Sequence, residues 1–184
     1  MEADWEFEVG GDAPIIEAHW SGFVDLRADS QHASALSECR DLPELADALI
    51  RLNAPDSPVW TSKIDVFTPD RIDPDEMAAS SCDAAHATTC YIDLLPRSDQ
   101  IWDTPSKVER ECRRICANLK VITLSRCRVD LVVRRAVEAG TCDLGMTVYL
   151  TACGPTPADA RERLAECLAL VTDVIAPGEI PHQR

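Results

Sequence analysis

Residues 125–152, SRCRVDLVVRRAVEAGTCDLGMTVYLTA, decide the fold of this 184-residue chain. Apolar residues occupy every second position from 127 to 133 and again from 146 to 152, and mostly polar residues lie between them. Because successive side chains of a β-strand point to opposite faces, each half predicts a strand with one apolar and one polar face. The stretch therefore predicts a β-hairpin whose apolar face is covered by the rest of the chain.

The same alternation predicts strands at 4–9, 58–67 and 88–95. In the strand at 58–67, strict alternation places Val59, Thr61, Lys63 and Asp65 on one face and Trp60, Ser62, Ile64 and Val66 on the other. The strand at 88–95 turns Cys90, Ile92 and Leu94 inward and Tyr91 and Asp93 outward. Residues 68–87 hold two prolines and five acidic residues and predict a long acidic connection between these two strands.

Three stretches have the spacing of amphipathic helices, each with a single apolar stripe. They cover residues 42–52, 105–119 and 157–175. Each of the last two starts at the proline of a Thr-Pro dipeptide, with the threonine as the cap, which is typical of a helix start. Since each helix has only one apolar face, it can cover one face of the sheet. We predict an α+β two-layer sandwich, with a mainly antiparallel sheet and the helices on one of its faces.

The order helix, strand, strand occurs twice in this prediction. Residues 63–66 align with 128–131, and residues 91–94 align with 149–152. An internal duplication of a helix-strand-strand unit is therefore a hypothesis. The length fits one domain over 1–176, and Pro177-Gly178 predicts the end of the last helix, with a loose C-terminal tail over 177–184.

The charge of the chain is strongly acidic and unevenly distributed. The net charge is −14, and the first 100 residues hold 21 acidic and 6 basic residues. This argues against nucleic-acid binding, which requires clustered lysine and arginine facing phosphates. No apolar run has the length of a membrane helix, and the acidic N-terminus does not resemble a signal peptide, so a cytoplasmic protein with no membrane association is expected.

Nine cysteines, an odd number, are expected to be free thiols in a reducing compartment. Several lie on predicted apolar faces, where cysteine acts as a small hydrophobic residue: Cys90, Cys112, Cys116, Cys127 and Cys167. The four histidines have no metal-motif spacing, and no phosphate-loop or dinucleotide-loop pattern is present. We therefore expect neither a metal nor a cofactor.

The polar face of the predicted sheet is the candidate site. It should gather Lys63, Asp65, Tyr91, Asp93, Arg128, Asp130 and Tyr149, together with Thr147 and Thr151. Three interpretations apply to such a face: a solvated or dimer-forming surface with Lys/Arg–Asp pairs, a surface that binds a ligand or partner, or an enzyme site in which neighbouring carboxylates act as acid and base.

Two functional hypotheses follow. The leading one is a cytoplasmic domain that acts by binding, either to itself or as an acidic inhibitor or immunity-type protein for a basic partner. The alternative is a small-molecule binder or enzyme that uses Asp65, Asp93 and Asp130, with Lys63 and Arg128 holding an anion. The shape of the polar face distinguishes them: a flat face favours self-association, and a hollow with carboxylates of raised pKa favours the alternative.

Overall fold

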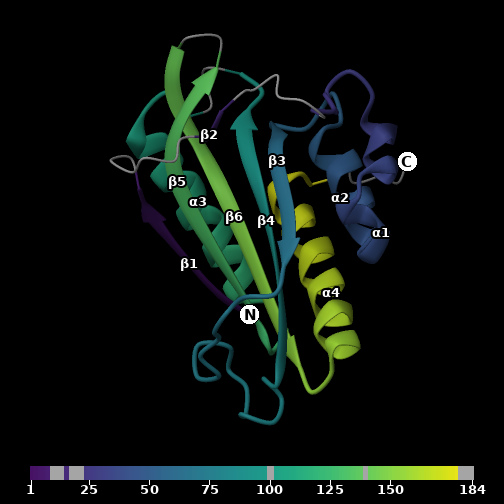
Figure 1. The fold of residues 1–184 in the computed structure, drawn as a ribbon. Coiled ribbons are helices and arrows are strands. Elements are labelled where there is room, and N and C mark those ends of the chain that lie inside the picture. The colour runs from purple at the N-terminus through teal and green to yellow at the C-terminus, as the bar shows by residue number, and fades with distance from the viewer. Residues whose placement is uncertain (9–14, 17–22, 99–101, 139–140, 178–184) are drawn as a thin grey trace, which may run out of the picture.

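The computed structural model describes residues 1–8, 15–16, 23–98, 102–138 and 141–177. The segments at 9–14 and 17–22 and most of the predicted tail at 177–184, from residue 178 on, lie outside the described residues. Figure 1 shows the elements in place. In chain order they are β1 (Glu2–Phe7), β2 (Ile15–Ile16), the 3₁₀-helix η1 (Ser30–Ala35), α1 (Glu38–Asp41), α2 (Pro43–Leu52), β3 (Val59–Phe67), β4 (His86–Pro96), α3 (Pro105–Lys120), β5 (Cys127–Glu138), β6 (Thr141–Gly154) and α4 (Pro157–Ile175).

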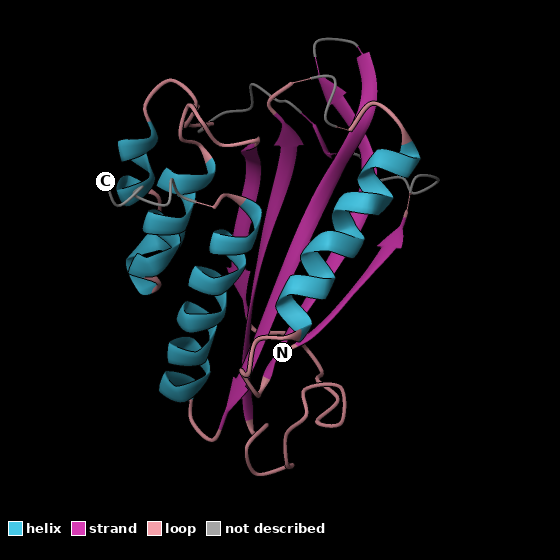
Figure 2. Cartoon of the chain, turned by 180° about the vertical axis from the view of Figure 1, so that it is seen from behind, coloured by secondary structure: helices cyan, strands magenta, loops and turns pink. Residues whose placement is uncertain are grey.

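The strands form one mixed sheet in the order β1-β5-β6-β4-β3, with the short β2 also pairing with β5. The pairs β5–β6, β6–β4 and β4–β3 are antiparallel, whereas β1 and β2 run parallel to β5. Figure 2 shows the described helices together on one face of the sheet. The predicted α+β fold with one helical layer is therefore confirmed.

The interface between the two layers forms the main core. The apolar positions of the central hairpin face the helices, and Val129, Leu131 and Leu150 are completely buried. The predicted inward cysteines are also buried. Burial raises the pKa of Cys90 and of Cys112 to about 12 each, so both thiols stay protonated at neutral pH. No described helix combines the length and apolar character that crossing a bilayer requires.

The register of the sheet supports the duplication hypothesis. The helix-strand-strand order α2-β3-β4 recurs as α3-β5-β6. Lys63 pairs with Asp93 in the first unit, and Arg128 pairs with Thr151 in the second. The sequence alignment matches Lys63 with Arg128 and Asp93 with Thr151. The two strands of each unit are therefore paired in the same register. Where the units meet, the equivalent residues Tyr91 and Tyr149 pair directly across β4 and β6.

Strand β3 departs from the predicted alternation. Its register with β4 shifts between Thr61 and Lys63, so one extra residue enters the strand there. Before the bulge, the side chains of β3 therefore point to the faces opposite to those predicted. Val59 belongs to the core under the helices, and Trp60 lies opposite Leu95 on the other face. The prediction that Val59 and Thr61 share a face with Lys63 and Asp65 is wrong, because it assumes unbroken alternation of side chains and a bulge interrupts that alternation.

The face of the sheet opposite the helices, called the open face below, is covered at both ends by small apolar clusters. Trp60, Leu95 and Ala136 form one cluster. The other consists of Met77, Ala87 and Cys153, with Met77 supplied by the 68–85 connection between β3 and β4. This connection therefore packs back onto the open face.

Both edge strands carry an aspartate that covers a backbone donor. Asp4 in β1 accepts a hydrogen bond of 2.8 Å from the N–H of Trp5, and Asp65 in β3 accepts one of 2.8 Å from the N–H of Val66. Unpaired N–H groups at a sheet edge are templates for pairing with another chain, and charged side chains on edge strands discourage such pairing. The predicted site residue Asp65 thus has a structural role at the edge.

The variant Asp65→Val is expected to self-associate at about tenfold lower concentration than the parent chain, because it exposes a β-branched edge with a free N–H. Sedimentation velocity measures this. The matched control is Asp47→Val on the exposed surface of α2, which makes the same change of charge away from any strand. Equal association of the two variants would contradict a protective role for Asp65.

Candidate functional site

The structure places all seven predicted site residues on the open face but divides them into two groups. One group lines a hollow, and the other lies beside it on β3 and β4. Tyr149 and Tyr91 connect the groups, since their rings lie 5.8 Å apart between centroids. The residues in the hollow are Arg128, Asp130 and Tyr149, and those beside it are Lys63, Asp65, Tyr91 and Asp93.

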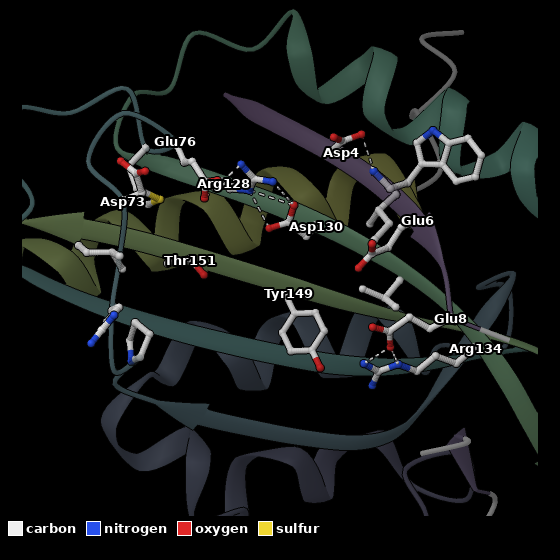
Figure 3. Close-up of a pocket in the computed structure, with 17 residues that line it drawn as sticks. Asp4, Glu6, Glu8, Asp73, Glu76, Arg128, Asp130, Arg134, Tyr149 and Thr151 are labelled. Atoms are coloured by element: carbon white, nitrogen blue, oxygen red, sulfur yellow. Dashed lines mark hydrogen bonds and ion pairs between the residues drawn. The ribbon is translucent and has the colours of Figure 1, made fainter. Parts of the chain in front are cut away.

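The hollow has a volume of about 560 Å³ and lies over β1, β5 and β6 (Figure 3). Its wall at one end is the 68–85 connection, which contributes residues between Pro69 and Met77. Its charged residues are Asp4, Glu6, Glu8, Asp73, Glu76 and Asp130 together with Arg71, Arg128 and Arg134.

Two of the three arginines in the hollow are already paired with its own carboxylates. The Nε and Nη2 atoms of Arg128 each lie 2.9 Å from a carboxylate oxygen of Asp130, and Glu76 approaches Arg128 at 3.5 Å. At the opposite end, Arg134 donates to Glu8 through Nε at 3.1 Å and through Nη2 at 2.8 Å. Figure 3 shows these two clusters at opposite ends of the hollow, with Tyr149 between them.

Three carboxylates in the hollow form no salt bridge within the part of the chain that the structure describes. Asp4 accepts a hydrogen bond from the N–H of Trp5, and its charge helps to raise the pKa of Arg128; Asp73 accepts one from the N–H of Asp75. Glu6 is exposed on β1. Unpaired carboxylates grouped in one concavity create a negative potential that attracts cations. The hollow is therefore suited to a positively charged group.

Asp93 is the buried carboxylate of the second group, with only 8% of its surface exposed. Thr147 donates a 2.5 Å hydrogen bond to it, and Arg134 approaches Thr147 at 3.5 Å. Burial raises the pKa of Asp93 above its usual value, against the opposing effects of the Thr147 hydrogen bond and the charges of Arg134 and Lys63. Asp93 does not line the hollow, so the raised pKa and the cavity occur in different places.

The variant Asp93→Asn should raise the melting temperature at pH 7. An acid whose pKa is higher in the folded than in the unfolded state destabilises the fold above that pKa, and this cost disappears as pH falls below the unfolded value. Asparagine keeps the oxygen that accepts from Thr147 but carries no charge. Calorimetry from pH 7 to pH 3.5 should show that the difference in melting temperature between variant and parent shrinks towards low pH. A variant that melts below the parent at pH 7 would contradict the raised pKa of Asp93.

Beside Asp93, the amino group of Lys63 lies 5.7 Å from the centroid of the Tyr91 ring. A hydrogen bond to Tyr91 and its negative potential raise the pKa of Lys63, so Lys63 carries its positive charge at neutral pH. Burial raises the pKa of Tyr91, which keeps that phenol protonated. Lys63 therefore places a positive charge beside the aromatic surface of Tyr91, with the carboxylates of Asp93 and Asp65 nearby.

Sequence reasoning missed most of the charged residues of the hollow. Asp4, Glu6 and Glu8 belong to a predicted strand, but the sequence does not show that this strand runs parallel to β5 and beside it. Arg134 continues the polar positions of the central hairpin and could have been included on that signal. Asp73 and Glu76 come from the acidic connection, and only the folded chain brings them to the open face.

Comparisons with protein families, with curated proteins and with solved structures find no match to this chain. The chemistry of the site therefore has to be inferred from its geometry. Within the described ranges, no three histidine, cysteine or acidic side chains are placed to hold a metal ion. What the hollow offers is a negatively charged concavity with an aromatic ring in its floor.

Proposed function

We propose that this protein acts by binding a basic protein partner, whose cationic side chains enter the hollow on the open face. The observation that carries the proposal is the charge of the hollow. Six carboxylates face three guanidinium groups, and two of those three are already neutralised inside the chain. A partner's arginine or lysine side chains would complete the pairing.

The distribution of charge along the chain supports the same partner. The first 100 residues supply five of the six carboxylates of the hollow and hold all of the net negative charge. A surface of one sign steers an oppositely charged partner and speeds its association, in a manner that depends on ionic strength. Binding of a basic partner is therefore expected to be fast and sensitive to salt.

A small organic cation is the second candidate, because a volume of about 560 Å³ lies within the range of small-ligand sites. The enzyme hypothesis receives less support. It requires carboxylates with separated pKa values in one cavity, and the buried carboxylate with a raised pKa, Asp93, lies outside the lining of the hollow.

The test uses a fluorescein-labelled hexa-arginine peptide as the probe and fluorescence anisotropy as the readout, between 20 and 300 mM NaCl. We expect binding at 20 mM NaCl that weakens steeply as salt rises. The absence of binding at low salt, or binding insensitive to salt, would contradict the proposal. Spermine serves as the small-cation arm: tighter binding of spermine than of the peptide would favour the second candidate.

A further inference from the structure

The open face carries a row of aromatic side chains that leads into the hollow. Phe67 on β3, Tyr91 on β4 and Tyr149 on β6 follow one another across the sheet, with ring centroids 6.5 Å and then 5.8 Å apart. Phe67 is 39% exposed, and the two tyrosines are partly exposed. Since Tyr149 also lines the hollow, the aromatic row and the hollow form one continuous surface.

The width of this surface sets the length of its occupant. From β3 to β1 the sheet order crosses four strand spacings, which at about 4.8 Å each amount to about 19 Å. An extended chain covers about 3.3–3.6 Å per residue, so about six residues span the surface. A segment of this length reaches from Phe67 to the carboxylates of β1.

The two ends of the surface differ in charge. Along the aromatic row, the amino group of Lys63 lies 5.7 Å from the centroid of Tyr91, and the guanidinium carbon of Arg134 lies 5.8 Å from that of Tyr149. Carboxylates balance both cations, since Lys63 lies near Asp93 and Asp65 and Arg134 is paired with Glu8, so the row offers aromatic surface rather than an unpaired charge. In the hollow, Asp4 and Glu6 favour a cation. A complementary segment is therefore cationic at one end only and uncharged over the row.

We infer that the partner presents an extended segment of about six residues, with an arginine in the hollow and proline or aromatic residues over the row. This inference depends on the proposed function. Proline and aromatic residues suit the row because they stack on aromatic rings and lose little conformational freedom on binding.

Arginine suits the hollow better than lysine because its planar fork can contact two carboxylates while stacking on an aromatic ring. The chain itself shows a simpler form of this in Arg134, whose Nε and Nη2 both donate to one oxygen of Glu8 while its guanidinium lies beside the Tyr149 ring. An arginine from the partner would repeat it with Asp4 and Glu6.

The experiment compares four labelled peptides by fluorescence anisotropy on the full chain. Arg-Gly-Pro-Gly-Pro-Trp and the reversed Trp-Pro-Gly-Pro-Gly-Arg test the complete surface in both directions. Arg-Gly-Gly-Gly-Gly-Gly tests the hollow alone, and Lys-Gly-Pro-Gly-Pro-Trp tests the preference for arginine. One of the two Pro-Trp peptides with arginine should bind about tenfold more tightly than the all-glycine peptide.

The variant Phe67→Ala should remove this tenfold gain and leave binding of the all-glycine peptide unchanged. Val121→Ala is the matched control, because Val121 is an apolar residue that is 81% exposed at the end of α3, on the helical side. If the gain survives in Phe67→Ala, or if the lysine peptide binds as well as the arginine peptide, the inference is wrong while the proposed function stands. If none of the four peptides binds while the hexa-arginine probe does, the inference is wrong and the proposed function stands; if hexa-arginine also fails to bind, both fail.

Discussion

The double variant Asp4→Asn/Glu6→Lys should bind the hexa-arginine probe about 30- to 150-fold more weakly, a loss of about 2–3 kcal/mol. These two positions hold carboxylates of the hollow that form no salt bridge among the described side chains. Charge-assisted contacts contribute about 1.5–3 kcal/mol each, and partial exposure reduces this. Asparagine at position 4 keeps an oxygen for the N–H of Trp5, so the edge of β1 stays protected.

A control with the same change in net charge separates local from general electrostatics. In Asp47→Asn/Glu162→Lys, both substitutions lie on exposed helical positions of α2 and α4, in the layer behind the sheet. This control should lose less than about threefold in affinity, because charges beyond a Debye length of about 10 Å are screened at 0.1 M salt. If the control loses as much as the hollow variant, the probe responds to net charge alone and the hollow is not the site.

Gly154→Ala should destabilise the fold by about 3 kcal/mol. A methyl group on Gly154 would lie 2.6 Å from the Cβ of Asp159, 2.7 Å from the backbone nitrogen of Ala160 and 2.9 Å from the carbonyl carbon of Asp159. Two of these atoms belong to the backbone of the first turn of α4, which cannot move aside as a flexible side chain can. The methyl group would therefore push α4 away from the end of β6.

The same clash acts on the cap of α4. Thr156 accepts a hydrogen bond of 3.2 Å from the N–H of Asp159, whose carboxylate accepts one of 3.1 Å from the N–H of Thr156. Thr156→Ala, which removes only the cap, should cost about 1 kcal/mol and serves as the comparison. Urea denaturation measures both variants, and a Gly154→Ala protein within 0.5 kcal/mol of the parent would show that the turn adapts.

Much of the fold follows from local pattern. The alternation of residues 127–133 and 146–152 predicted both the central hairpin and the face that it buries, because burial of one face leaves a period of two in the sequence. The single stripes of α2, α3 and α4 predicted a layer on one side only. Such patterns are local, so the sequence displays them directly.

The candidate site could be predicted only in part. The sequence correctly assigned Arg128, Asp130 and Tyr149 to the polar face of the hairpin, since that assignment needs only alternation. It could not separate them from Lys63 and Asp93, which share the face but lie outside the hollow. The separation depends on the sheet order, which places Lys63 and Asp93 on β3 and β4, whereas the hollow lies over β1, β5 and β6.

By itself, the sequence determined the long helices and the main strands, the sidedness of the central hairpin and the acidic character of the chain. Each of these is recorded in the spacing or number of residues along the chain. The tertiary structure alone decided that β1 lies parallel to β5, that β3 changes face at its bulge, and that acidic residues from three separate segments meet in one hollow. These features arise from pairing between segments far apart in the chain. Such pairing produces no periodic pattern in either segment, so the local sequence does not reveal it.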